Sequence, residues 1–141
     1  MSVRAFSLVA VGSGLGAVLR FSLGQVFVSG RGVAFPVATL LVNLLGCLLV
    51  GLLAGRWVAK EGVPAVSGRW HFWITGVCGG FTTFSALSSE VLWMTLEGRG
   101  PFAGLYAAAS IGLGLFAVWA GLSYSMTSRA RAVESSEGVN G

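Results

Sequence analysis

The sequence predicts an all-α membrane protein of four transmembrane helices, the third of which is broken at mid-membrane. Hydrophobic residues make up 55% of its 141 residues and charged residues only 10%. A soluble domain carries about 25% charged residues, because its surface must face water. Four long apolar stretches also alternate with short polar breaks along the chain. The chain therefore has too few charges to face water, and we expect lipid around it.

The first two stretches are long enough to cross a bilayer, which takes about 20 mostly apolar residues. The first covers about residues 6–28 and contains one charge, Arg20. It ends before the break at residues 29–32. Pro36 suits the first turn of a helix, so it opens the second stretch, about residues 35–55.

The third stretch covers about residues 70–93, and tryptophans mark both of its ends, as is typical of the membrane interface. The fourth covers about residues 102–126, after the polar break at 97–101. Together the four stretches form one transmembrane domain, residues 1–127. The remaining tail, residues 128–141, is polar and contains Gly and Ser, and we predict that it is disordered.

The distribution of basic residues favours cytoplasmic termini. Four spans place both termini on one side of the membrane. The side with the termini holds Arg4, Arg56, Lys60, Arg69, Arg129 and Arg131. The other side holds Arg31, Arg99 and, if it reaches that far, Arg20. Cytoplasmic loops of membrane proteins carry an excess of Lys and Arg. We therefore expect a multi-pass plasma (inner) membrane protein with cytoplasmic termini if its orientation is fixed.

The middle of the third stretch is a poor continuous helix. Gly76, Gly79 and Gly80 precede Thr82 and Thr83, and glycine costs about 1 kcal/mol relative to alanine in a helix interior. Backbone groups freed by a break cannot face lipid, so they must be buried or line an ion site. The carbonyls that end one half-helix suit a cation, and the amides that open the other suit an anion. Alternatively, the glycines only permit close helix packing.

Uncharged hydrogen-bond donors also lie within the spans. Thr39 and Asn43 share one helix face, and Tyr106 lies one turn before Ser110. A lone Ser or Thr in a membrane helix commonly bonds its own backbone, but the amide of Asn43 needs a partner.

Two phenylalanines flank the threonines of the third stretch. Phe81 and Phe84 are ordinary core or lipid-facing residues in one interpretation. In another, the positive edges of their rings face an anion. Such rings, together with neutral donors, would replace the hydration shell of a small anion weakly enough for conduction.

Three motifs resemble the CrcB/Fluc family of fluoride channels. They are residues 79–85, Gly-Gly-Phe-Thr-Thr-Phe-Ser; residues 43–46, Asn-Leu-Leu-Gly; and residues 16–20, Gly-Ala-Val-Leu-Arg. The similarity covers all four spans. It implies a passive channel that exports fluoride and protects the cell from its toxicity. It also implies an antiparallel dimer with two pores and a structural sodium ion at the dimer interface, with no organic cofactor.

The resemblance also implies roles for particular residues. The backbone carbonyls of Gly79 and Thr82 would hold the sodium ion, and Arg20 would lie in a vestibule. Asn43 would orient a ring and donate to fluoride. The fluoride pathway would include Asn43, Phe84, Thr39, Ser85, Ser88, Tyr106, Ser110, Phe81 and Thr83.

Two features depart from the family pattern. The family usually has a second pore phenylalanine three residues after the first, where this chain has Leu87. The charge bias is also larger than a protein that inserts in both orientations needs. The chain is therefore either a dual-topology homodimer or one subunit of a paralogous heterodimer.

Other function classes fit the sequence less well. The basic residues form no stripe, so no nucleic-acid partner is expected. A small four-helix proton-coupled exporter needs a carboxylate inside a span, and the nearest, Glu90, lies towards the end of the third. A non-conducting scaffold or assembly subunit would leave Asn43 and the threonines unexplained. His71 is the single histidine and lacks a nearby nucleophile, so we expect no enzyme.

Overall fold

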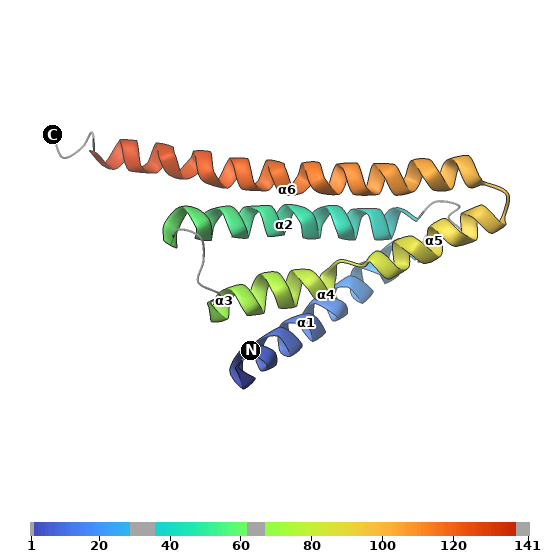
Figure 1. The fold of residues 1–141 in the computed structure, drawn as a ribbon, viewed down its shortest axis with the longest axis horizontal. Helices are drawn as coiled ribbons and strands as arrows, with labels where there is room; N and C mark the ends of the chain where they lie inside the picture. Colours follow the sequence, from blue (N-terminus) through green and yellow to red (C-terminus); the bar gives the residue numbers. More distant parts are fainter. Residues whose placement is uncertain (1, 29–35, 62–66, 138–141) are drawn as a thin grey trace.

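The computed structural model describes residues 2–28, 36–61 and 67–137, and these residues are helical apart from short connections. Figure 1 shows how the helices lie along one another. The elements are α1 (Val3–Val28), α2 (Val37–Glu61), α3 (Gly68–Trp70), η1 (His71–Cys78), α4 (Gly79–Phe81), α5 (Phe84–Leu96) and α6 (Gly100–Glu137). The predicted loops at 29–32 and around Pro64 lie outside the described residues.

Three of the helices are long and apolar enough to cross a membrane without interruption. These segments are Val3–Val26, Val37–Val58 and Gly100–Ser128, which match the first, second and fourth predicted spans. The prediction for the tail was wrong over its first part, because α6 continues to Glu137. Residues 127–137 contain no Gly or Pro, and their Ala, Arg and Glu residues favour a helix.

The third span is a composite of α3, η1, α4 and α5, as the sequence predicts. The backbone leaves the helix at Thr82 (φ −77°, ψ 158°), and Thr83 is also extended (φ −148°, ψ 118°). Gly79 itself remains helical, so the break lies three residues later than the first glycine of the motif suggests. The π-helical stretch His71–Cys78 is not anticipated by the sequence.

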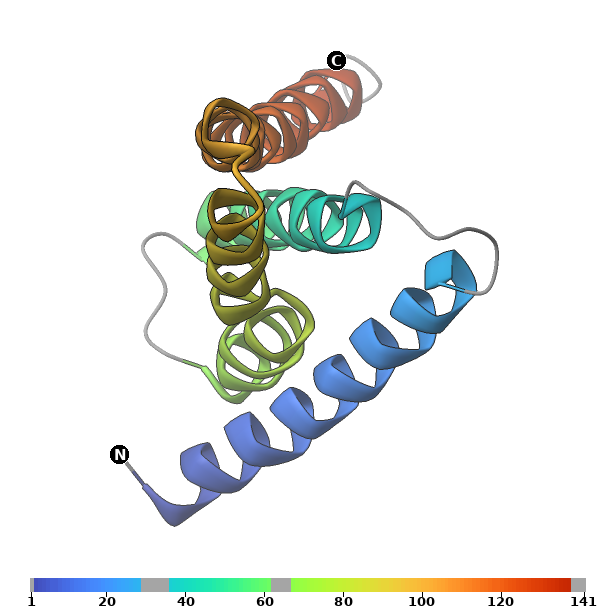
Figure 2. The same ribbon diagram turned by 90° about the vertical axis from the view of Figure 1, so that its right-hand side faces the viewer.

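The four spans form two parallel pairs. α2 and α6 run side by side, and α1 runs along η1 and α4 (Figure 1). In Figure 2 the third span lies between α1 and the α2–α6 pair. Glycines bring the helices close: a Cβ added to Gly121 would lie 2.7 Å from the Leu48 carbonyl oxygen, and one added to Gly12 would lie 2.5 Å from that of Phe72. Both pairs therefore pack backbone against backbone.

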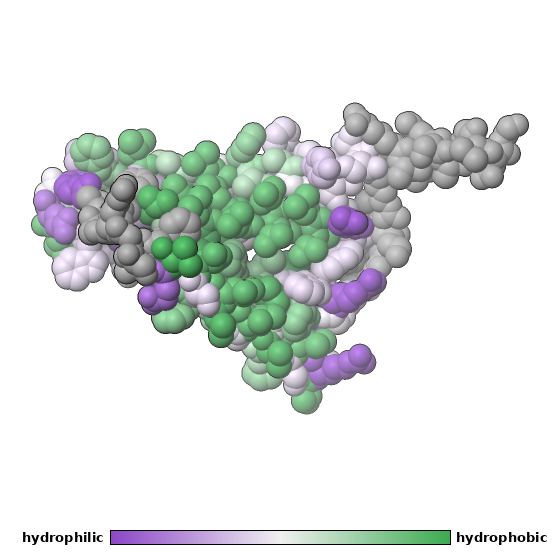
Figure 3. All heavy atoms as spheres, turned by 180° about the vertical axis from the view of Figure 1, so that it is seen from behind, coloured by the Kyte–Doolittle hydropathy of each residue, from purple (hydrophilic) through white to green (hydrophobic). Residues whose placement is uncertain are grey.

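Most of the large apolar side chains face outward, as lipid-facing residues do. Figure 3 shows this hydrophobic surface between more polar ends. A small buried cluster joins α5 to α6 and contains Leu87, Met94, Ala103 and Tyr106. This cluster aligns α5, the second half of the broken span, against α6.

Candidate functional site

The break in the third span is held by one amide side chain from α2. The Nδ2 group of Asn43 donates to the Thr83 carbonyl oxygen at 3.0 Å, and the Thr83 N–H donates to Asn43 Oδ1 at 2.8 Å. An extended residue presents its amide and carbonyl sideways, so a carboxamide can bond both. Asn43 therefore replaces the helical partners that Thr83 has lost, which satisfies the expectation that its amide is paired.

The break leaves the last carbonyl oxygens before it without helical donors, among them those of Gly79 and Thr82. In a continuous helix the N–H of Thr83 would bond to the carbonyl of Gly79, and that of Ala86 would bond to the carbonyl of Thr82. Here the Thr83 N–H donates to Asn43, and the Ala86 N–H donates to Thr83 Oγ1 at 3.1 Å. The carbonyls of Gly79 and Thr82 thus lose their helical donors at the break.

The neighbouring carbonyl of Cys78 differs from these two. It accepts the Thr82 N–H and the Thr82 hydroxyl, each at 3.0 Å. The Thr83 hydroxyl also lies 3.1 Å from the hydroxyl of Ser85 while it caps α5. The break is therefore an ordered turn that specific hydrogen bonds hold in place.

A carboxylate lies further along α5, between α2 and α6. The Thr39 hydroxyl donates to Glu90 Oε1 at 2.5 Å, and the Tyr106 hydroxyl donates to Oε2 at 2.7 Å. The Tyr106 side chain is only 2% exposed, and Ser110 is buried one turn further along α6. Sequence reasoning missed Glu90 as a member of this group because it treated the residue as part of the span's outer end. The signal was a carboxylate in an otherwise uncharged span.

A cavity of about 370 Å³ lies beside the break, among α1, α2 and α5. It is lined by Arg20, Gly24, Ala38, Thr39, Val42, Thr83, Ser85, Ala86 and Ser89. The lining provides one guanidinium, several hydroxyls and no carboxylate. Such a cavity attracts an anion through Arg20 and offers it neutral hydrogen-bond donors. Thr39 belongs to both the cavity and the Glu90 group, so the two sites adjoin.

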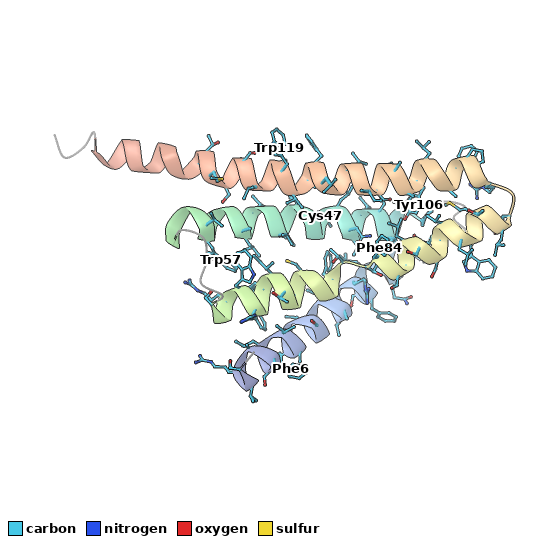
Figure 4. The ribbon with its side chains drawn as sticks, in the orientation of Figure 1. Phe6, Cys47, Trp57, Phe84, Tyr106 and Trp119 are labelled. Atoms are coloured by element: carbon cyan, nitrogen blue, oxygen red, sulfur yellow. The ribbon has the colours of Figure 1, made fainter. Side chains whose placement is uncertain are left out.

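The structure brings most of the predicted site residues together but separates the aromatic ones. Phe81 is 7% exposed and packs near Gly46, whereas Phe84 is 74% exposed (Figure 4). Ser88 is exposed and is not part of the cavity lining. Leu87 is 6% exposed and packs in the cluster around Tyr106.

Comparison with known proteins identifies relatives along nearly the whole transmembrane part. The family model described as CrcB-like protein, Camphor Resistance (CrcB), matches residues 7–122. A fluoride-specific ion channel FluC from Rhizobium etli is 44% identical over 116 residues, which cover 82% of this chain and 91% of that protein. The FluC protein of Hyphomonas neptunium is 45% identical over 120 residues, covering 85% of this chain and 94% of its own. That of Flavobacterium psychrophilum is 44% identical over 115 residues, covering 81% and 90%.

Proposed function

The chain belongs to the CrcB family, and we propose that it is a fluoride-specific ion channel that lets fluoride leave the cell passively and so protects it from fluoride toxicity. The observation that carries this proposal is the break in the third span, which Asn43 holds beside a cavity that contains Arg20. A channel of this family accounts for the hydrophobic helices and calls for no enzymatic reaction.

The fluoride pathway that we propose begins at the cavity and continues past the break. Arg20 attracts the anion, and the hydroxyls of Thr39, Thr83 and Ser85 offer it neutral donors. One N–H of the Asn43 amide bonds to Thr83, so its second N–H is the one that can serve fluoride. The remaining members of the proposed pathway are Phe81, Phe84, Ser88, Tyr106 and Ser110.

Glu90 extends this pathway as a group that orients hydroxyls. As an acceptor for Thr39 and Tyr106, it fixes the directions of both O–H groups. Both hydroxyls already donate hydrogen bonds to the carboxylate. An anion that arrives beside it can therefore accept a hydrogen bond from one of these hydroxyls only if that hydroxyl turns away from Glu90. The proposed step is therefore an exchange of one hydroxyl between Glu90 and fluoride, which keeps fluoride binding weak enough for release.

The released carbonyls at the break fit a sodium ion. Na⁺ is a hard cation that binds oxygen ligands, and the carbonyls of Gly79 and Thr82 have each lost a helical donor. We propose that these two carbonyls hold a structural sodium ion together with the same pair from a second subunit. The ion would offset the repulsion between carbonyl dipoles that meet at the break.

The assembly that we propose is an antiparallel dimer. Phe84 is 74% exposed immediately after the break, and a polar turn next to it cannot face lipid. A second subunit packed against this surface covers both. The dimer is either a homodimer or a heterodimer with a paralogue. Leu87 favours the heterodimer, because its aliphatic side chain stands where the family usually has a pore phenylalanine and so removes one ring from the pathway.

The charge distribution supports a fixed orientation with cytoplasmic termini in the plasma (inner) membrane. The support is the count of basic residues, six on the side with the termini against two or three on the other, because Lys and Arg set the orientation and acidic residues contribute little.

Fluoride efflux from liposomes that contain only this chain tests the proposed function. A fluoride electrode should record rapid efflux, from this chain alone or after its paralogue is added, when a potassium ionophore balances the charge, and a chloride electrode should record none. Empty liposomes give the background. Robust fluoride efflux from the pure chain would rule out an obligate paralogous partner. If efflux is absent even after the chain is combined with its paralogue, the channel function itself is wrong.

A further inference from the structure

Arginines from three elements gather at one end of the molecule. Arg4 lies on the first turn of α1, Arg56 near the end of α2 and Arg69 on α3, and all three side chains are exposed. We call these three residues the basic rim. Figure 1 shows the start of α1, the start of α3 and the end of α2 at the same end of the fold.

Side-chain contacts tie the three elements together at this end. A Cβ added to Gly68, directly before Arg69, would lie 3.2 Å from Leu8 Cδ1, one turn along from Arg4. The rings of Trp57 and Trp70, which directly follow Arg56 and Arg69, have centroids 6.1 Å apart. The basic rim is therefore a set of neighbouring residues.

Tryptophans beside the rim indicate that it belongs to the interface end of the spans. Trp57, Trp70 and Trp73 accompany it, and Trp73 is 45% exposed. Tryptophan rings concentrate where hydrocarbon meets the polar interface. In Figure 3 hydrophilic side chains lie at this end, just beyond the hydrophobic surface.

The rim also has an excess of positive charge. By sequence, the segments at this end carry three acids, Glu61, Glu134 and Glu137, and six basic residues: Arg4, Arg56, Lys60, Arg69, Arg129 and Arg131. At the opposite end, within the described residues, Arg99 pairs with Glu97 and lies over the Phe102 ring at 5.8 Å. The two ends of the molecule therefore differ in charge as well as in composition.

We propose that the basic rim binds the phosphate headgroups of anionic phospholipids. A guanidinium matches a phosphate with two parallel hydrogen bonds, and an arginine near an anionic leaflet strengthens binding about fivefold. The neighbouring tryptophans mark the level of the lipid headgroups. The phosphates that the guanidinium groups meet at this level therefore belong to bound lipids and not to a free soluble anion. Bound lipids would then anchor the ends of three spans at a defined depth.

Tryptophan quenching by brominated lipids tests this proposal on the full-length protein in bilayers. In a Trp93→Phe/Trp119→Phe background the fluorescence comes from Trp57, Trp70 and Trp73, next to the rim. Brominated phosphatidylglycerol should compete for this surface at least about fivefold better than brominated phosphatidylcholine. The preference should fall towards unity in Arg4→Gln/Arg56→Gln/Arg69→Gln, and higher salt should weaken it.

Arg99→Gln, at the opposite end, is the matched control and should keep the full preference. If the triple variant does not fold, Arg4→Gln alone should still reduce the preference, because Arg4 is exposed on the first turn of α1. Equal quenching by both lipids in the parent protein would overturn the proposal. The proposal would also be overturned if inorganic phosphate relieved the quenching more than chloride does at the same ionic strength. That result would indicate a site for free phosphate.

Discussion

At the level of single residues, Asn43 shows how one side chain can stabilise an unwound backbone inside a membrane. Its carboxamide has a donor and an acceptor at the spacing that an extended residue requires, and it uses both on Thr83. Without this pair, the N–H and carbonyl of Thr83 would lack partners in a low-dielectric setting. The break is therefore held by hydrogen bonds between α2 and the third span.

Asn43→Asp should disrupt the break while it keeps the size of the side chain. Aspartate can accept from the Thr83 N–H but cannot donate to the Thr83 carbonyl when ionised, so two acceptors then face each other. We expect a loss of about 1–3 kcal/mol in stability. Fluoride efflux should also fall, because aspartate lacks the second amide N–H that is proposed to serve fluoride.

Thermal unfolding in detergent and fluoride-electrode efflux measure the two effects of Asn43→Asp. Ser22→Ala is the control, since the Ser22 hydroxyl is exposed and donates to the Val18 carbonyl of its own helix. An Asn43→Asp protein with the parental Tm and efflux would contradict the role assigned to the amide.

Phe84→Ile should reduce fluoride efflux with little effect on the fold of the subunit. Phe84 is 74% exposed in the single subunit, so its replacement removes few contacts within that subunit. The reduction is expected because isoleucine has no positive ring edge to present to an anion.

The control for Phe84→Ile is Phe102→Ile, which replaces a ring that is 63% exposed at the start of α6, away from the break. Efflux from liposomes and Tm should be recorded for both. Equal efflux from the two variants would remove Phe84 from the proposed pathway.

At the level of elements, the third span combines two kinds of irregularity. Residues 71–78 form a π-helix, and residues 82 and 83 leave the helix altogether. α1 packs along this region, where its glycines contact backbone atoms of η1 and α4. The close contact with α1 therefore supports the irregular segment from one side, and Asn43 supports it from the other.

Gly16→Ala should destabilise the protein much more than Gly14→Ala. A Cβ at Gly16 would collide with the Val77 carbonyl oxygen and lie 2.7 Å from the Phe81 nitrogen, whereas a Cβ at Gly14 meets nothing within 4 Å. Backbone atoms cannot rotate away as side chains can, so we expect a loss of about 1–3 kcal/mol for Gly16→Ala. Gly14→Ala should be neutral or slightly stabilising, because alanine favours a helix.

Tm in detergent, together with the fraction of monodisperse protein, checks this pair of glycine variants. Similar values for Gly16→Ala and Gly14→Ala would mean that α1 does not pack on the broken span as described.

At the level of the whole molecule, the ends of the four spans decide how the chain sits in a membrane. α1 and the third span run in one direction, and α2 and α6 run in the other (Figure 1). This arrangement places both termini at one end, which is also the end with the basic rim. The proposed orientation and the proposed lipid contact therefore depend on the same surface.

Cysteine labelling from the two sides of the membrane tests the orientation. In a Cys47→Ala/Cys78→Ala background, Ser2→Cys and Ser128→Cys place one thiol near each terminus, and both positions are exposed. Because positive residues favour the cytoplasm, a membrane-impermeant maleimide should reach neither thiol in intact cells and both after permeabilisation.

Two other labelling patterns are informative. Partial labelling of both thiols to the same extent in intact cells would indicate dual topology. Labelling of only one of them would contradict an even number of spans.

Much of the architecture was predictable from the sequence because its causes are local. Apolar stretches of membrane length define the spans, and the glycines and threonines at residues 76–83 predict the break. The requirement that Asn43 be paired also follows from its chemistry alone. The motifs around Asn43 and residues 79–85 indicated the family that the comparisons confirm.

Only the tertiary structure decided which groups meet, because hydrogen-bond partners far apart in the chain depend on how helices pack. Asn43 and Thr83 are separated by 40 positions, and Thr39 and Glu90 by 51. The burial of Leu87 against α6 and the π-helix of residues 71–78 likewise result from packing between helices. The sequence alone therefore determined the spans and the position of the weak point in the third, and the packing of α1 and α2 determined how that weak point is stabilised.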